Sequence, residues 1–256
     1  VISMPDIILE THNLRKVFGA LVAVDDVSIQ VQAGTIHSII GPNGAGKTTF
    51  FNLLSGNLEP TAGRVVYKGK DITRLPLHRS AHIGIGRSFQ ITNLFPNLTA
   101  LENVRLACQA LGKDNFAFLR PAGHFKQYEA RAWAILQQVG LAERGLMPAR
   151  TLAHGDQRKL ELGIILAADP ELLLLDEPTA GMAAEQVPEL MALIKQIQTS
   201  GDKTIVLVEH NMNVVMSSSD RITVMHQGQV LAEGAPAEIA ANETVQQAYL
   251  GGLYEL

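Results

Sequence analysis

The sequence has few of the features that mark secreted or membrane-spanning proteins. A single cysteine, Cys108, excludes an internal disulfide framework and is typical of a reducing compartment. We expect Cys108 to be a small apolar residue of a helix. No apolar run approaches the ~20 residues that a membrane-spanning helix needs. The first ten residues, VISMPDIILE, show neither the basic start nor the long apolar run of a signal peptide.

Basic residues are not in excess either. The 256 residues carry 21 Lys and Arg against 25 Asp and Glu, which gives a formal net charge of −4. This balance argues against a nucleic-acid partner, because phosphate backbones are bound through broad basic patches. The chain is long enough for one elaborated domain, or two, with a large buried core. We expect a cytoplasmic protein that is able to dock onto a membrane protein.

One stretch, residues 41–49 (GPNGAGKTT), carries the strongest functional signal. It matches G-x-x-x-x-G-K-[ST] and lies between a strand pattern at 35–40 and a helix pattern that ends near residues 55–56. The backbone N–H groups of such a loop form a positive cup for a polyphosphate. Lys47 is expected to neutralise the β- and γ-phosphates, and Thr48 to ligate Mg²⁺. The expected nucleotide contacts are Gly41, Pro42, Asn43, Gly44, Ala45, Gly46, Lys47, Thr48 and Thr49.

Two further apolar stretches end in residues that packing explains poorly. Residues 171–175 (ELLLL) predict a strand buried on both faces, and Asp176 and Glu177 follow it directly. Asp176 suits the shell of a Mg²⁺ ion, and Glu177 suits a general base that polarises the attacking water. Residues 203–208 predict a second buried strand, after which comes His210. The carboxyl ends of parallel strands are where α/β sheets bind their ligands.

Strand and helix patterns alternate along the chain, which indicates an α/β fold. Further strands are expected at 7–10, 23–31, 64–67 and 83–91, with a hairpin of 221–225 and 229–233 around residues 227–228. Helices are expected at 100–110, 127–139, 187–198 and 238–250, and residues 112–127 are expected to be irregular. Thr99 and Glu102 suggest a capping box at the start of the first of these helices. Trp133 is expected to lie in the core.

Phe18 lies upstream of the phosphate loop, just before a turn at Gly19. Two interpretations of this aromatic residue stay open. An exposed ring at this position suits stacking on an adenine base, whereas a buried ring is simply part of the sheet core.

The phosphate loop, followed by a T-x-G-x-V-x-x-x-G-x-D-I segment, resembles the ATPase subunits of ATP-binding cassette (ABC) transporters. The resemblance covers residues 7 to 245, and six motifs occur in the family's order. It implies a P-loop NTPase (RecA-like) core with a mostly parallel sheet, an N-terminal antiparallel β-layer and an inserted helical subdomain. We expect one domain over 1–256, with a core at 1–90 and 166–243, a helical subdomain at 91–165 and a C-terminal helix and tail at 238–256.

The resemblance also implies roles for particular residues. Gln90 is similar to the family's Q-loop glutamine, which reaches Mg²⁺ and the attacking water and senses the membrane partner. His210 matches the switch histidine that hydrogen-bonds the γ-phosphate. Residues 152–157 (LAHGDQ) lie where the family has L-S-G-G-Q, whose helix N-terminus contacts the γ-phosphate held by a second protomer. The corresponding nucleotide contacts are Ala153, His154, Gly155 and Asp156.

This signature departs from the family's pattern. Ala153 replaces a serine, His154 a glycine and Asp156 a glutamine, and Ala183 replaces the aspartate usual in the following D-loop. A lost hydroxyl contact to phosphate costs about 1.5–3 kcal/mol if nothing replaces it. These departures leave open a degenerate cassette that binds ATP without hydrolysing it.

The resemblance implies ATP and Mg²⁺ as cofactors and a head-to-tail dimer with itself or a related ATPase. It implies transmembrane permease subunits as partners, a solute-binding protein as an indirect partner, and a location on the inner face of the cell membrane. GIGRSFQ, EPTAGM and LVEHNMNVVM resemble importers of branched-chain and other hydrophobic amino acids, whose relatives move urea or short amides. An ATPase for lipopolysaccharide export and a soluble ABC protein of translation or DNA repair are the alternatives.

Overall fold

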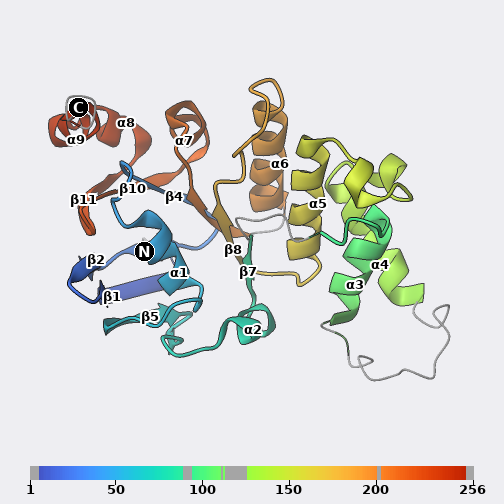
Figure 1. Cartoon of the computed structure of the whole chain (residues 1–256), viewed down its shortest axis with the longest axis horizontal. Coiled ribbons are helices and arrows are strands. Elements are labelled where there is room, and N and C mark those ends of the chain that lie inside the picture. The colour runs from blue at the N-terminus through green and yellow to red at the C-terminus, as the bar shows by residue number, and fades with distance from the viewer. Residues whose placement is uncertain (1–5, 89–93, 111, 113–125, 201–202, 252–256) are drawn as a thin grey trace, which may run out of the picture.

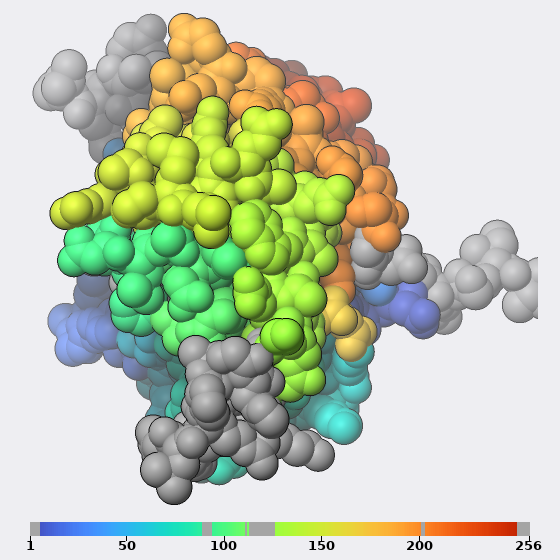
Figure 2. Space-filling view, turned by 90° about the vertical axis from the view of Figure 1, so that its right-hand side faces the viewer, coloured from blue at the N-terminus to red at the C-terminus, as the bar shows by residue number. Residues whose placement is uncertain are grey.

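The computed structural model describes residues 6–88, 94–110, 112, 126–200 and 203–251. These residues form two sheets with helices packed around them (Figure 1). The described helices α3, α4 and α5 come between two strands of the larger sheet in the chain and lie together at one end of the molecule (Figures 1 and 2). The expected mixed architecture, with a mostly parallel sheet and an antiparallel one, is confirmed.

The larger sheet has the order β11-β10-β4-β9-β8-β7. All neighbours are parallel except β11, which pairs antiparallel with β10. Every residue of β4, β8 and β9 is buried, because helices cover both faces of the sheet centre. The strands are β4 (Ile36–Ile40), β7 (Ile85–Arg87), β8 (Leu172–Asp176), β9 (Thr204–Val208), β10 (Arg221–His226) and β11 (Gln229–Gly234).

The smaller sheet is antiparallel and comes from the N-terminal part of the chain. Its strands are β1 (Ile7–Phe18), β2 (Leu21–Val27), β3 (Gln30–Gln32), β5 (Ala62–Tyr67) and β6 (Lys70–Asp71). The expected single strand at 23–31 is wrong, because β1 pairs first with β3 and then with β2. At the change of partner the hydroxyl of Thr11 donates to Val27 O (3.1 Å) and accepts from Ile29 N (3.0 Å), in place of ladder hydrogen bonds.

The described helices begin and end close to their expected bounds in most cases. They are α1 (Lys47–Leu54), α2 (Leu77–Ser80), α3 (Ala100–Ala110), α4 (Lys126–Gln138), α5 (His154–Leu166), α6 (Val187–Ser200), α7 (Met212–Ser218), α8 (Pro236–Ala240) and α9 (Glu243–Gly251). Cys108 is buried in α3, as expected. Of the segment expected to be irregular, residues 113–125 lie outside the described residues.

One helix prediction in the C-terminal part of the chain was wrong, and one helix was missed. The helix expected at 238–250 is two helices, because Asn242 Oδ1 accepts a hydrogen bond from Val245 N (3.1 Å) and starts a new helix there. Helix α7 was not expected at all. The sequence feature that could have indicated this helix is Asn211. Its side chain accepts a hydrogen bond from Asn213 N (3.0 Å) and caps the helix N-terminus.

Three other expectations are corrected. The strand expected at 83–91 is short, because residues 81–83 form a 3-10 turn that ends at Gly84 with φ +90°. The capping box is half formed: Glu102 N donates to Thr99 Oγ1 (3.1 Å), but the Glu102 carboxylate accepts from Arg105 instead. Trp133 packs against the main hydrophobic cluster but is half-buried rather than fully buried.

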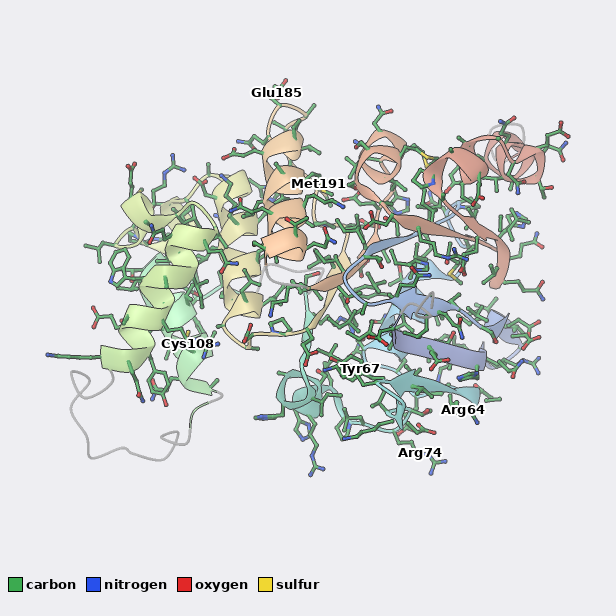
Figure 3. All side chains as sticks on the ribbon, turned by 180° about the vertical axis from the view of Figure 1, so that it is seen from behind. Arg64, Tyr67, Arg74, Cys108, Glu185 and Met191 are labelled. Carbon is green, nitrogen blue, oxygen red and sulfur yellow. The ribbon has the colours of Figure 1, made fainter. Side chains whose placement is uncertain are left out.

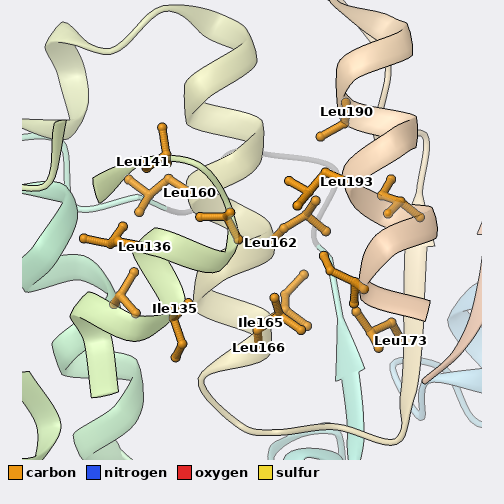
Figure 4. Close-up of a cluster of buried hydrophobic side chains, with 14 of the residues drawn as sticks. Ile135, Leu136, Leu141, Leu160, Leu162, Ile165, Leu166, Leu173, Leu190 and Leu193 are labelled. Atoms are coloured by element: carbon orange, nitrogen blue, oxygen red, sulfur yellow. The ribbon is translucent and has the colours of Figure 1, made fainter. Parts of the chain in front are cut away.

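Helix α5 has apolar residues on two faces, and both are covered. In Figure 4, Leu160 lies on the side toward Leu136 and Leu141, whereas Leu162 lies toward Leu193 of α6. These residues belong to one continuous buried cluster that runs from α3 and α4 through α5 to α6 and β8. The helical segment and the larger sheet therefore share a hydrophobic core.

Candidate active site

The phosphate loop follows β4 and is held closely by its neighbours. A Cβ atom at Gly46, where φ is +94°, would lie 2.3 Å from the carbonyl oxygen of Ala23 in β2. A Cβ atom at Gly41 would lie 2.2 Å from Met225 O in β10. The turn of the β10–β11 hairpin also contacts the loop, since Gly228 N donates to Ala45 O (3.0 Å). Glycine at 41 and 46 is thus required by close backbone approach.

Lys47 begins helix α1 and folds back over the loop. Its Nζ donates to Gly41 O (2.7 Å) and Pro42 O (2.9 Å), and the residue is 6% exposed. Burial lowers the pKa of Lys47, while the nearby carboxylates Glu177 and Asp176 oppose that shift. The ammonium group therefore lies over the phosphate loop. Gly46, the N-cap residue of α1, has no side chain that could cap the helix N-terminus. Thr48, the next residue, is exposed.

Asp176 ends β8 with an unsatisfied carboxylate oxygen. The residue is 4% exposed, and its Oδ1 is buried without a hydrogen-bond partner among the described residues. Burial raises the pKa of this carboxyl group, and the Glu177 carboxylate raises it further. Burying a carboxylate oxygen that accepts no hydrogen bond costs free energy, unless a cation compensates its charge.

Glu177 follows Asp176 in a left-handed conformation with φ +47°. Its backbone N–H donates to Val208 O at the end of β9 (2.9 Å), which holds it beside the neighbouring strand. The Oε1 atom lies 2.6 Å from Nε2 of His210. A non-glycine residue held at positive φ costs of order 1–3 kcal/mol, so the surrounding contacts must hold Glu177 in this conformation.

Glu209 was not expected from the sequence to matter, yet it links the two strand ends. It is 3% exposed, and its Oε1 accepts from Thr179 N (3.0 Å) and Thr179 Oγ1 (2.5 Å). Its Oε2 accepts from the backbone N–H of His210 (3.1 Å). The loop that follows Glu177 is thereby tied to the residue before His210. No sequence signal identified this carboxylate, because Thr179, its partner through two hydrogen bonds, lies in the turn that follows another strand.

Ser88 is a second residue that sequence reasoning missed. Its hydroxyl accepts from Asp176 N (2.9 Å), while Ser88 N donates to Leu174 O (2.9 Å). The segment that leads from β7 toward Gln90 is thus attached to the end of β8. Gln90 itself lies outside the described residues.

Phe18 lies at the end of β1 and is 45% exposed. The interpretation of Phe18 as sheet core is therefore wrong. Phe18 pairs with Leu21 across the β1–β2 turn, and β2 supplies the Ala23 carbonyl that approaches Gly46. The exposed ring is consequently on the hairpin that contacts the phosphate loop, while Lys16 Nζ lies 5.1 Å from its centroid.

The signature residues begin helix α5 beside the loop that follows β8. Ala153 is the N-cap residue and makes no side-chain cap, and both it and His154 are exposed. A Cβ atom at Gly181 would lie 3.3 Å from Cε1 of His154, so the imidazole packs on this loop. Arg158 donates to Ala180 O (3.3 Å) from the same helix. The helix N-terminus and the D-loop thus form one surface.

Asp156 is turned into the chain rather than outward. It is 7% exposed, forms an ion pair with Arg144, and lies 3.8 Å from Nζ of Lys159. Helices α1 and α5 are drawn apart in Figure 1, with β7 and β8 between them. Nucleotide contacts from Ala153, His154, Gly155 and Asp156 stay a prediction.

The comparisons with known proteins agree with this geometry. A family model described as ABC transporter matches residues 24–180, and one described as branched-chain amino acid ATP-binding cassette transporter matches residues 229–254. The high-affinity branched-chain amino acid transport ATP-binding protein BraF of Pseudomonas aeruginosa is 42% identical, over 95% of this chain and 98% of its own length. The corresponding protein LivG of Escherichia coli is 40% identical over the same shares. The lipopolysaccharide export system ATP-binding protein LptB of Acidithiobacillus ferridurans is 32% identical, over 97% and 99%.

Solved structures show the same fold. A cassette of an ABC transporter superposes with a TM-score of 0.85 at 31% identity, over 95% of this chain and 99% of that one. A dimeric cassette in a post-hydrolysis state, bound to ADP and Pi, gives a TM-score of 0.75 at 28% identity, over 89% and 98%. The chain is a nucleotide-binding protein that belongs to the ATP-binding subunits of the ABC transporter family.

Proposed function

We propose that this chain is the ATP-hydrolysing subunit of an importer of branched-chain or other hydrophobic amino acids, or of related amides or urea. The observation that carries the proposal is the 42% identity to BraF across 95% of the chain. The family match at residues 229–254 supports it at the C-terminal end. The relative named for lipopolysaccharide export is only 32% identical. Lipopolysaccharide export is therefore the second candidate function.

Hydrolysis is assigned to the residues at the ends of β4, β8 and β9. The N–H groups of the phosphate loop and Lys47 bind the phosphates of ATP. Glu177 accepts the proton of the attacking water, and its carboxylate is oriented by the hydrogen bond to His210. Phe18 stacks on the adenine. Each of these roles is part of the proposal.

The residues present fit a Mg²⁺ ion. Asp176 offers a buried oxygen that has no partner among the described residues, and Thr48 offers an exposed hydroxyl one residue after Lys47. Among the residues that the structure describes, no three His, Cys, Asp or Glu side chains form a self-contained metal site. The ion would therefore rest on Thr48, Asp176, Gln90 and oxygens of the nucleotide, and it would supply positive charge against the phosphates.

We further propose a division into a core at 1–90 and 166–243 and a helical subdomain at 91–165, working as a head-to-tail dimer. A single chain has one phosphate loop and one signature, and α1 and α5 lie apart (Figure 1). The dimeric cassettes among the structural neighbours support this arrangement. The second protomer is the same chain or a related ATPase.

The transport-system names of the relatives support permease subunits as partners, and a solute-binding protein as an indirect one. In the described part of the chain, no helix is both long and apolar enough to cross a membrane. The proposed location is therefore peripheral, on the inner face of the cell membrane, through contacts to the permeases.

The test is a pull-down of tagged Glu177→Gln chain from solubilised native membranes in the presence of Mg-ATP. Two multi-span permeases and a second ATPase would support the amino-acid importer. Co-purification of lipopolysaccharide-export subunits would move the assignment to the second candidate. Recovery of ribosomal or DNA-repair proteins without any membrane protein would overturn the transporter assignment.

A steady-state ATPase assay addresses the departures in the signature. The alternative of a degenerate cassette rests on Ala153 and Ala183. We expect turnover, because Lys47, Asp176 and Glu177 are in place. Binding of ATP without turnover, in the presence of the permeases, would favour the degenerate cassette.

A further inference from the structure

A cavity opens away from the phosphate loop, between the antiparallel sheet and helix α2. It has a volume of about 680 Å³ and includes no residue of the 41–49 loop among its lining. We call it the arginine cavity, after three of its lining residues, Arg64, Arg74 and Arg79. Figure 3 shows Arg64 and Arg74 on the same outer side of the molecule.

None of the three guanidinium groups in this cavity forms a direct ion pair with a described carboxylate. Within the described residues, Arg64, Arg74 and Arg79 form no ion pair within 4.0 Å. Five other described arginines are paired with carboxylates, namely Arg15, Arg105, Arg144, Arg158 and Arg221, whereas Arg131 and Arg150 form no such pair and line no part of this cavity. Three like charges that line one hollow repel each other unless an anion lies between them.

Basic residues are in excess around the arginine cavity, although they are not in excess in the whole chain. The whole chain is acidic, with 21 Lys and Arg against 25 Asp and Glu. Between residues 62 and 82, however, the only acidic residue is Asp71, whereas the basic ones are Arg64, Lys68, Lys70, Arg74 and Arg79. Lys16 adds a further ammonium group nearby, since its Nζ donates to Glu59 O at the wall of the cavity (2.7 Å).

Two carboxylates also line the cavity, but neither pairs with an arginine. Hydrogen bonding to Thr73 lowers the pKa of Asp71, first from the Thr73 side chain and then from Thr73 N, which lies 2.9 Å from Asp71 Oδ1. Arg64 and Arg74 lower it further through space. The side chain of Glu59 is exposed at the rim. The arginine forks are therefore left available to an external ligand.

We propose that the arginine cavity binds a phosphate group. A phosphate carries several oxygens and up to two negative charges, so it can accept from more than one guanidinium fork at once. A volume of about 680 Å³ exceeds a single phosphate and admits a phosphorylated metabolite or a phospholipid headgroup. The shared chemistry is the phosphate, and the experiment separates the two sources.

The experiment measures the modification of individual arginines by phenylglyoxal. The chain is treated alone, with inorganic phosphate, with vesicles of phosphatidylcholine and with vesicles that also contain phosphatidylglycerol. Digestion with a protease that does not cut at arginine, followed by mass spectrometry, gives the rate at each side chain. Arg131 and Arg150, which are exposed on the helical segment, are internal controls in the same digest.

We expect inorganic phosphate to slow modification of Arg64, Arg74 and Arg79 roughly tenfold relative to Arg131 and Arg150. Added protection by phosphatidylglycerol vesicles, and none by phosphatidylcholine alone, would identify a lipid headgroup. Protection by free phosphate alone would identify a soluble ligand. Equal rates with and without phosphate, or equal protection of Arg131 and Arg150, would overturn the proposal.

A pair of charge-matched variants gives an independent readout. The triple variant Arg64→Gln, Arg74→Gln, Arg79→Gln is compared with Lys126→Gln, Arg131→Gln, Arg150→Gln, which changes the net charge equally. We expect only the first triple variant to lose phosphate affinity, by roughly tenfold or more. Similar losses in both would mean that net charge, and not this cavity, attracts the anion.

Discussion

Nε2 of His210 and Oε1 of Glu177 lie 2.6 Å apart, although the two residues follow different strands of the sheet. An ionised carboxylate can only accept, so the imidazole donates this hydrogen bond from Nε2. The contact brings the proposed general base and the proposed switch histidine together within one chain. It depends on β8 and β9 being neighbours, since Glu177 N is also bonded to Val208 O.

Glu177→Gln is expected to abolish most turnover while leaving nucleotide binding intact. The amide keeps the shape of the side chain but cannot take a proton from water, and general-base catalysis typically contributes 10²- to 10⁴-fold. Phosphate release gives the rate, and a fluorescent nucleotide gives the dissociation constant. The control is Glu129→Gln on the exposed side of α4. Hydrolysis at the parental rate in Glu177→Gln would show that another group is the base.

Glu209→Gln is expected to lower kcat with little change in KM. The carboxylate accepts three hydrogen bonds, from Thr179 N, Thr179 Oγ1 and His210 N. An amide NH₂ cannot accept, so at least one buried donor loses its partner, at a cost of about 1–3 kcal/mol in the free energy of unfolding. Glu209 is a positioning residue, because it acts through the loop that follows Glu177.

The kcat–KM split distinguishes positioning by Glu209 from a merely structural role. A structural role would lower the amount of folded enzyme and leave the kinetic constants of the folded fraction unchanged. Glu171→Gln, at an exposed ion pair with Lys68, is the matched control. An unchanged kcat per folded Glu209→Gln molecule would contradict the prediction.

His37 is expected to make the fold sensitive to mild acid. It is fully buried in β4, 2.7 Å from Thr223 Oγ1, and burial lowers its pKa from 6.5 to about 4. Glu233 opposes this shift and Arg221 adds to it. Between pH 6.5 and 4, His37 binds a proton in the unfolded chain but stays neutral in the folded chain. Stability is therefore full above pH 6.5 and falls by about 3 kcal/mol as the pH drops to 4.

Urea unfolding midpoints across this pH range test the role of His37. The His37→Gln variant should lose this part of the pH dependence, while His78→Gln, at an exposed histidine, should keep it. An identical slope in the parent chain and in His37→Gln would rule out His37 as the source.

Gly46→Ala is expected to fold poorly or to lose nucleotide binding. The added Cβ would meet Ala23 O at 2.3 Å, and the residue would be held at φ +94°. Gly140→Ala is the control, because Gly140 has φ +73° but no atom within 4 Å of an added Cβ. We expect only about 1 kcal/mol of lost stability for Gly140→Ala. Thermal unfolding and a nucleotide titration compare the two, and equal effects would contradict the steric argument.

The sequence predicted that the phosphate loop, Asp176 and Glu177 lie at strand ends because that placement is local. Residues 41–49, Asp176 and Glu177 each follow directly on a buried apolar run, so short windows of sequence contained both the strand and its functional residue. The same windows could not predict the contacts of Glu209, since they depend on Thr179, which approaches from the turn that follows the neighbouring strand. The ion pair of Asp156 with Arg144 likewise depends on a turn twelve residues away folding back.

The boundaries of helices and strands were predicted wrongly where a hydrogen-bonding side chain interrupts a segment whose hydrophobic pattern continues. Asn242 divides a helix whose apolar spacing continues past it, and Thr11 lets one long strand serve two partners. Phe18 could not be resolved from sequence, because an aromatic residue before a turn is compatible with burial and with exposure. The fold places it at 45% exposure.

The hydrophobic core that α5 shares with the larger sheet affects how the molecule unfolds. Leu160 and Leu162 place the two faces of one helix against different parts of the fold (Figure 4). Excising the helical segment would expose both faces, so this segment is not expected to persist alone. Amide hydrogen exchange of α5 should match that of β8, as one cooperative unit, rather than that of the outer helices.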